Sequence, residues 1–222
     1  MGLNVVFAGT LPYGEALDIQ YKLFDKRVKG EIGNTLLLLE HPPVLTMGGR
    51  GEDKHIFLSE SQLKERGIEI FRIDRGGDVT YHGPGQLVGY IIYNMYDIDR
   101  DVRLFIRKIE NTFINLLRDH FSLEAVGEIG KHTGVWIDGE KITAIGISVR
   151  QWVSMHGFAF NVNTDLRHFD WINPCGLSMG VTSVEKLTGR PAQMEKMFSL
   201  TAEYFAKELG EELLERELTE LI

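Results

Sequence analysis

The fold class is decided by the stretch GVWIDGEKITAIGISV, residues 134–149. Two runs rich in β-branched residues lie on either side of Asp138-Gly139, a dipeptide that favours the tight turn of a β-hairpin. A hairpin pairs its strands antiparallel, which a purely parallel, doubly wound sheet does not allow. The stretch therefore predicts a mixed sheet that contains antiparallel strands.

Further strands and helices are predicted on both sides of this hairpin. Apolar runs or alternation typical of strands occupy residues 35–39, 68–73, 87–93 and 152–163. Helical spacing of apolar residues is found over 13–29, 101–120 and the last thirty residues, and Ser59 with Gln62 forms a capping-box pattern for a short helix ending at Gly67. The sequence thus predicts an α/β fold with a mixed, largely antiparallel sheet flanked by helices, in a single domain of residues 1–222.

The bulk composition limits the classes of partner. The chain has 222 residues and a formal net charge of -8, which argues against nucleic acid or an anionic membrane as the main partner. One cysteine excludes an intramolecular disulfide and favours a reducing, cytoplasmic setting. No apolar run approaches the roughly 20 residues of a membrane span.

A glycine-rich segment joins two predicted strands. It reads Arg75-Gly76-Gly77-Asp78-Val79-Thr80-Tyr81-His82-Gly83-Pro84-Gly85-Gln86. Glycines let backbone N–H groups approach a ligand closely, so the segment can form the wall of a pocket. The alternative is a purely structural loop, and the segment matches neither a Walker loop nor a dinucleotide-binding fingerprint.

Two further residues are candidates for chemistry. Cys175 lies in the turn sequence Asn173-Pro174-Cys175-Gly176, where a thiol has the partial exposure that reactivity needs. Lys141 begins an apolar strand directly after a turn, and beside Cys175 its charge would favour the thiolate. The alternatives are a small buried thiol and a solvated lysine at a strand end.

Together these segments resemble the lipoyl(octanoyl) transferases, which are related to the biotin and lipoate protein ligases. That family shows Arg-Gly-Gly-x-x-Thr-x-His-x-Pro-Gly-Gln, matched by residues 75–86, and Lys-x-x-x-x-Gly, matched by residues 141–146. It also shows His-Gly-x-Ala-x-Asn, matched by residues 156–161, and Pro-Cys-Gly, matched by residues 174–176. Four motifs in the right order, within residues 13–190, make the resemblance specific.

The resemblance implies a biotin/lipoate protein ligase-like fold and a role for each motif. Cys175 would carry the acyl group as a thioester, and Lys141 would lower the proton affinity of the thiol. The acyl chain would lie against Arg75, Gly76, Gly77, Asp78, Val79, Thr80, Tyr81 and His82, against Ala144, Ile145 and Gly146, and against Gly157, Phe158 and Ala159. The small residues at 146, 157 and 159 are expected to leave a slot for the alkyl chain.

The implied reaction is octanoyl transfer from octanoyl-acyl carrier protein to the lysine amine of lipoyl domains, the first step of protein lipoylation. The implied acceptors are the lipoyl domains of 2-oxoacid dehydrogenases and the glycine cleavage H protein. No cofactor and no metal are implied, and a monomer is expected. The alternatives are an ATP-dependent lipoate–protein ligase, a non-catalytic acyl-binding module, and a Cys–His thioesterase that uses His82 or His156.

Several points stay open at this level. Oxyanion donors could come from the backbone around Cys175-Gly176 or from the segment 75–85. His82 could bond Lys141 or the substrate carbonyl, or it could only hold the shape of the loop. Because acyl carrier proteins and lipoyl domains are commonly acidic, a basic patch near the site is expected, drawn from Arg72, Arg75, Arg100, Arg103, Arg107, Lys108 and Arg150; the alternative is a solvated helix face.

Overall fold

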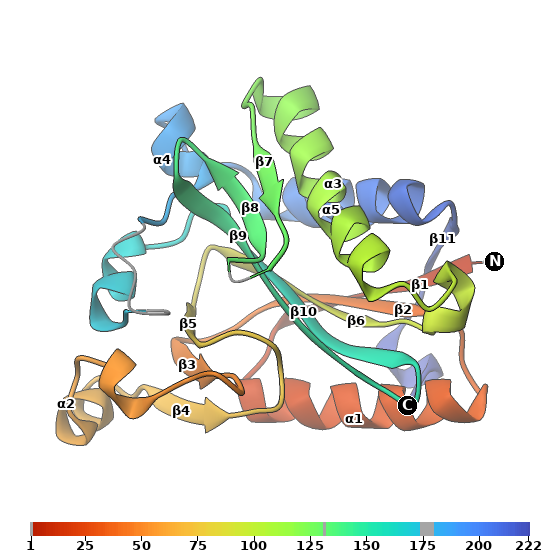
Figure 1. The fold of residues 1–222 in the computed structure, drawn as a ribbon, viewed down its shortest axis with the longest axis horizontal. Helices are drawn as coiled ribbons and strands as arrows, with labels where there is room; N and C mark the ends of the chain where they lie inside the picture. Colours follow the sequence, from red (N-terminus) through yellow and green to blue (C-terminus); the bar gives the residue numbers. More distant parts are fainter. Residues whose placement is uncertain (1, 131, 174–179) are drawn as a thin grey trace.

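The computed structural model describes residues 2–130, 132–173 and 180–222, and its strands form two sheets (Figure 1). In spatial order the eight-stranded sheet contains β11 (Glu212–Glu215), β1 (Gly2–Thr10), β2 (Thr35–Glu40), β6 (Gln86–Ile92), β10 (Val153–Asn161), β9 (Glu140–Arg150), β8 (Gly134–Ile137) and β7 (Val126–Glu128). β1 pairs parallel with β11 and with β2, and the other neighbours pair antiparallel. The predicted mixed, largely antiparallel sheet is confirmed.

Helices cover both faces of this sheet. α1 (Tyr13–Lys29) packs against β6 and β10 on one face, while α3 (Val102–Phe121) and α5 (Met194–Leu209) pack together on the other (Figure 1). The remaining helical segments are short: α2 (Glu60–Glu65), α4 (Val184–Thr188), η1 (Asp53–His55), η2 (Met95–Ile98), η3 (Leu166–Trp171) and η5 (Leu218–Glu220). Within the described ranges, none of the helices has the length and apolarity needed to cross a membrane.

The inner strand β2 shows why the core has two layers. Its continuous apolar run is buried throughout, and successive side chains of a strand point to opposite faces. Leu36 and Leu38 join the cluster under α3 and α5, whereas Leu37 and Leu39 join the cluster under α1. The sheet is therefore buried on both faces along its middle strands.

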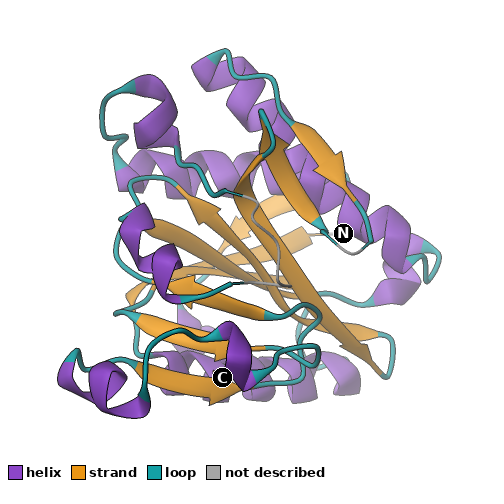
Figure 2. Ribbon diagram, turned by 60° about the vertical axis from the view of Figure 1, so that its left-hand side comes forward, coloured by secondary structure: helices purple, strands orange, loops and turns teal. Residues whose placement is uncertain are grey.

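A smaller sheet lies beside the large one (Figure 2). Its strands, in order, are β4 (Glu69–Arg72), β3 (Val44–Met47) and β5 (Val79–His82). It has a core of its own, in which Leu63 of α2 packs with Leu45 and Tyr81. The predicted capping box of α2 is present, with the Ser59 and Gln62 side chains bonding each other's backbone N–H groups.

The decisive hairpin forms as predicted. β8 and β9 are joined by Asp138 and Gly139, whose φ angles are 49° and 80°. Two central residues at positive φ make a turn whose twist matches that of the paired strands. Gly139 takes this conformation without steric cost, and aspartate is among the few other residues that tolerate it.

The C-terminal prediction is partly wrong. The helical pattern of the last thirty residues holds only as far as Leu209, because Gly210 at φ 71° ends α5 in a left-handed cap. Leu213 and Leu214 then lie in β11, an edge strand parallel to β1. The strands β1, β3, β5 and β7 were not predicted, and β5 lies inside the segment interpreted as a loop.

Candidate active site

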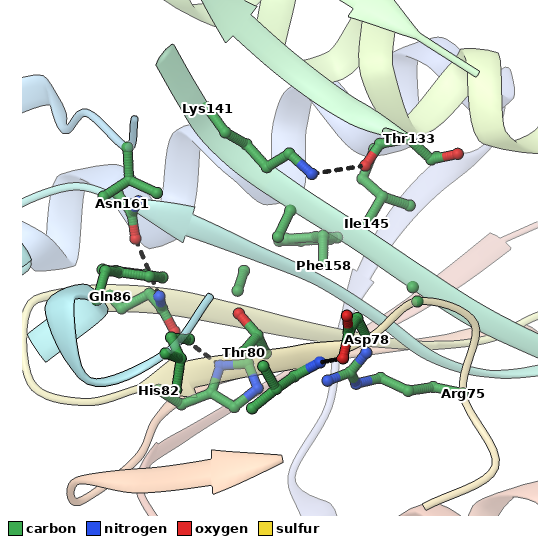
Figure 3. A pocket seen from close by; sticks show the side chains of 18 of the residues that line it. Arg75, Asp78, Thr80, His82, Gln86, Thr133, Lys141, Ile145, Phe158 and Asn161 are labelled. Carbon is green, nitrogen blue, oxygen red and sulfur yellow. Dashed lines mark hydrogen bonds between the residues drawn. The ribbon is translucent and has the colours of Figure 1, made fainter. Parts of the chain in front are cut away.

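A cavity of about 600 Å³ is lined by residues from both sheets (Figure 3). The large sheet contributes Val88 and Tyr90 from β6 and most of the motif residues of β9 and β10. The other wall comes from residues 75–78, which precede β5 of the small sheet, and from Val79, Thr80 and His82 of β5 itself. Three of the four sequence motifs, which are distant along the chain, therefore meet at one hollow.

Nearly all the described residues predicted to contact the acyl group line this cavity: Arg75, Gly76, Gly77, Asp78, Val79, Thr80, His82, Ala144, Ile145, Gly146, Gly157, Phe158 and Ala159. Tyr81 differs, because its ring packs 5.7 Å from that of Phe169 and 6.0 Å from that of Trp171, between centroids. Alternation along β5 explains the difference, since Thr80 and His82 project from the opposite face of the strand. The structure thus places the Tyr81 side chain in the core of the small sheet.

Lys141 reaches the cavity because β9 contains a bulge. Gly134 pairs with Ala144, whereas Trp136 pairs with Lys141, so three residues of β9 span the space of two on β8. Ile142 points into the core, and Lys141 lies on the cavity side together with Ala144. Regular alternation would place residues three apart on opposite faces, so the bulge is what turns Lys141 toward the cavity.

The proposed nucleophile, Cys175, lies outside the described residues. The described residues nearest to it on either side, Asn173 and Gly180, both line the cavity. The Asn173 N–H donates to the His55 carbonyl over 2.8 Å, and the Lys141 N–H donates to the Gly180 carbonyl over 2.9 Å. Backbone hydrogen bonds therefore hold Asn173 and Gly180 at the cavity.

The Arg75 segment is fastened to both sheets. The Arg75 guanidinium donates to the Thr46 carbonyl and hydroxyl over 2.8 and 2.9 Å, and the Gly76 N–H donates to the Ile147 carbonyl over 3.1 Å. A Cβ atom on Gly146 would lie 2.7 Å from the Gly76 carbonyl oxygen, closer than real contacts allow. Glycine at position 146 is therefore required for the segment to dock against β9.

Gly157 has a similar role in the sheet. A Cβ atom there would lie 2.1 Å from the carbonyl oxygen of Gly89, on the neighbouring strand β6. The glycines at positions 146 and 157 thus allow backbone to approach backbone, and a carbonyl oxygen takes the space beside each of them, where a slot was expected. Both glycines also line the cavity.

His82 takes part in a buried hydrogen-bond chain (Figure 3). Its Nδ1–H donates to the Gln86 amide oxygen over 2.7 Å, and Gln86 Nε2 donates to Asn161 Oδ1 over 2.9 Å. Asn161 Nδ2 then donates to the Thr182 carbonyl over 3.0 Å. Since the Thr182 N–H donates to the Lys141 carbonyl, the chain runs from the Arg75–Gln86 segment to the strand that carries Lys141. These partners agree with the alternative in which His82 holds the shape of the loop.

The family model for the lipoyl protein ligase A/B catalytic domain matches residues 12–206. The chain belongs to this family. The octanoyltransferase of Caldicellulosiruptor bescii is 51% identical over 214 residues, which cover 96% of this chain and 94% of that protein. The octanoyltransferase of Desulforamulus reducens is 48% identical over 208 residues, covering 93% and 91% respectively. The family predicted from the four motifs is confirmed.

Solved structures confirm the predicted fold. A lipoate-protein ligase A bound with ATP superposes with a TM-score of 0.77 at 16% identity, covering 100% of this chain and 92% of that one. A biotin protein ligase from Aquifex aeolicus, in complex with biotin and ATP, gives 0.56 at 11% identity, covering 95% and 71%. Across the lipoyl protein ligase A/B family and the biotin ligases, the arrangement of the sheet is therefore shared.

Two buried histidines of the family domain are held neutral. Burial and, to a smaller extent, the neighbouring His41 lower the pKa of His82 to about 3. Burial also lowers the pKa of His41 to about 4, against a bond to the Leu11 carbonyl that favours the charged form. Charging either imidazole would place a cation among aromatic rings, since His41 lies between the rings of Tyr13 and Tyr90.

We predict that this pair makes the fold sensitive to acid. Below pH 6.5 the unfolded imidazoles bind protons and the folded ones do not, down to about pH 4 for His41 and about pH 3 for His82. The free energy of unfolding therefore falls as the pH falls through this range. Above pH 6.5 the stability from this source is fully present, and each histidine accounts for a loss of order 3 kcal/mol across the window. Urea unfolding at stepped pH measures this. His82→Gln should flatten the slope, while the exposed His120→Gln should not; equal slopes in all three proteins would contradict the prediction.

The predicted basic patch does not gather at this cavity. Of its seven members, Arg75 lines the cavity and donates to Thr46, while Arg72 and Arg150 line a separate surface hollow. Of the other four, Arg100 precedes α3, and Arg103, Arg107 and Lys108 belong to it; none of them lines the cavity. Arg50, which sequence reasoning did not select, is exposed and does line the cavity.

Proposed function

We propose that this chain transfers an octanoyl group in two half-reactions, with Cys175 as the acyl carrier between them and Lys141 as the proton-transfer group. The donor is octanoyl-acyl carrier protein. The acceptor is the lysine amine of a lipoyl domain, as in 2-oxoacid dehydrogenases and the glycine cleavage H protein. We propose further that the chain works as a single catalytic domain, monomeric and cytoplasmic.

Octanoyl transfer is supported by the relatives of this chain. Curated relatives at 43–51% identity, over 93–97% of the chain, are named octanoyltransferase, which identifies this chain as an acyltransferase of lipoylation. The lipoate and biotin ligases of known structure share only the fold at 9–18% identity. An ATP-dependent ligase is therefore less favoured than an octanoyltransferase as the function of this chain.

The chemistry balances without ATP. The Cys175 thiolate attacks the carbonyl carbon of the donor thioester, and the carrier's thiol leaves with a proton that Lys141 supplies. The acceptor amine then attacks the Cys175 thioester, and the C–N bond forms as the C–S bond breaks. The proton lost by the amine returns to Lys141, and the Cys175 thiolate is regenerated. The first exchange replaces one thioester by another, and the second forms a more stable amide, which draws the sequence forward.

The cavity supports an alkyl substrate. The lining residues of β9 extend from Lys141 to Gly146, a span of five residue-to-residue steps or roughly 16 Å at about 3.3 Å each. Ala144 and the residues beside it on the neighbouring strands, Ala159 and Val88, provide apolar wall along this path. Each buried CH₂ contributes about 0.8 kcal/mol, so an eight-carbon chain is held by several kcal/mol while neighbouring chain lengths differ little.

We predict a covalent intermediate on Cys175. Mixing the protein with octanoyl-acyl carrier protein should raise its intact mass by one octanoyl group, and peptide mapping should place the group on Cys175. Adding an unmodified lipoyl domain should remove the adduct and octanoylate the domain. The Cys175→Ser variant should form no thioester.

Three outcomes would refute the route. Full transfer by Cys175→Ser would exclude the thioester, and a requirement for ATP would indicate a ligase. Free octanoic acid as the main product in the presence of acceptor would indicate a thioesterase.

A further inference from the structure

We infer that Trp136 is a positioning residue, whose indole face, together with the Thr133 carbonyl, holds the Lys141 ammonium at the cavity. The inference rests on the proposed function, because the role of Lys141 belongs to it. The four-carbon stem of a lysine has many rotamers, so a lysine that must act on one thiol needs neighbours that select one of them. Trp136 and Thr133 lie outside the four family motifs.

The lysine head has two described partners. Lys141 Nζ lies 4.6 Å from the centroid of the Trp136 ring, within the range of a cation–π contact. It also donates to the Thr133 carbonyl over 3.4 Å (Figure 3). Trp136 belongs to β8, and Thr133 lies in the turn before it.

The bulge in β9 brings these groups together. Directly opposed residues of an antiparallel pair project from the same face, and the bulge makes Trp136 the residue opposite Lys141. In an unbulged register Trp136 would oppose Ile142, a core residue. The same register shift that turns Lys141 toward the cavity therefore places the indole beside it.

The indole itself is held firmly. Trp136 is 6% exposed, and its Nε1–H donates to the His132 carbonyl over 3.1 Å. The Thr133 hydroxyl closes the preceding turn, donating to the Gly130 carbonyl over 2.9 Å and accepting from the Gly130 N–H over 3.0 Å. Hydrogen bonds thus fix both the indole and the turn that carries the Thr133 carbonyl, and a group that positions another side chain needs to be held in this way.

The closeness of strand β8 depends on Gly134. A Cβ atom there would lie 2.4 Å from the Thr143 carbonyl oxygen and 3.4 Å from Lys141 Cε, and its φ of 149° disfavours other residues. The aliphatic stem of Lys141 therefore passes beside the Gly134 backbone, where no side chain intervenes.

Trp136 could not be predicted as a neighbour of Lys141 from the sequence, because regular alternation along β9 directs the Lys141 side chain to the face away from the cavity.

The test compares Trp136→Leu and Trp136→Phe with the wild type. We expect Trp136→Leu to lower kcat for octanoyl transfer about tenfold or more, with KM for octanoyl-acyl carrier protein within about twofold. Trp136→Phe keeps an aromatic face and should recover most of the rate. The exposed Trp152→Leu, at the β9–β10 turn, is the matched control and should transfer normally.

A double-variant cycle separates positioning from structure. In a Lys141→Met background, Trp136→Leu should cause no further loss, because the group that it positions is gone. An equal loss in both backgrounds, or a rise in KM with kcat unchanged, would overturn the inference. If the wild type forms no Cys175 adduct, the proposed function fails instead, so the two failures are distinguishable.

Discussion

Replacing Lys141 with Met is expected to reduce octanoyl transfer by about 10²–10⁴-fold, the range attributed to a positioned proton-transfer group. Both half-reactions should slow, because each moves a proton to or from a sulfur or nitrogen of the reacting groups. Met keeps the length and the apolar stem, and its sulfur packs well against Trp136, so the fold should be retained. Single-turnover acylation and deacylation, followed by mass spectrometry, measure the two steps separately.

The control is Lys186→Met. Lys186 belongs to α4, is half-exposed, and pairs with Glu140, the residue before Lys141, over 2.8 Å. An exposed pair of this kind contributes little to stability, so its loss should leave transfer within about twofold. Transfer by Lys141→Met above a tenth of the wild-type rate would contradict the assigned role.

Lys141→Arg divides the role further. Arginine keeps the positive charge but does not release its proton at accessible pH. Slow transfer by Lys141→Arg, with rapid alkylation of Cys175, would assign proton transfer to the lysine amine. Alkylation that is rapid in Lys141→Arg but slow in Lys141→Met would assign thiolate stabilisation to the positive charge.

The fold was predictable where local signals agree with tertiary pairing. The dipeptide Asp138-Gly139 is enough to specify its hairpin. The amphipathic helix α3 begins directly after Asp101, whose carboxylate accepts hydrogen bonds from the Arg103 and Leu104 N–H groups. The edge strands were not predictable in this way. β1 pairs with β11 across about two hundred residues, and Leu213 and Leu214 continue a helical spacing by chance after Gly210 has ended α5.

The candidate site shows a comparable division. The motifs identified which residues meet, since Arg75, Ala144 and Phe158 line one cavity. They did not reveal how those residues are held, because the hydrogen bonds of His82 and Gln86 depend on strands that only the folded chain brings together. A one-residue register shift in β9 is likewise invisible in a pattern of alternation, yet it determines which face Lys141 occupies.

Gly146→Ala is expected to remove most of the acyl-binding capacity while the protein remains folded, and Gly146→Val should remove more. The added Cβ would lie 2.7 Å from the Gly76 carbonyl oxygen and 3.4 Å from Arg75 Cδ, so the segment must move away from β9. That movement breaks the bond from the Gly76 N–H to the Ile147 carbonyl and opens the cavity wall to water. Overpacking of this kind costs about 1–3 kcal/mol, which a domain of this size tolerates.

Acylation of Cys175 at limiting octanoyl-acyl carrier protein should therefore fall about tenfold for Gly146→Ala and about a hundredfold for Gly146→Val, since several buried CH₂ groups lose their wall. Gly14→Ala is the matched control, because a Cβ there meets only the Phe71 ring at an ordinary 3.7 Å, and alanine suits the start of α1. Thermal unfolding confirms that each variant is folded. Wild-type acylation by Gly146→Val would mean that the Arg75 segment does not form the wall of the acyl site, and the chain would have to bind its substrate elsewhere in the cavity.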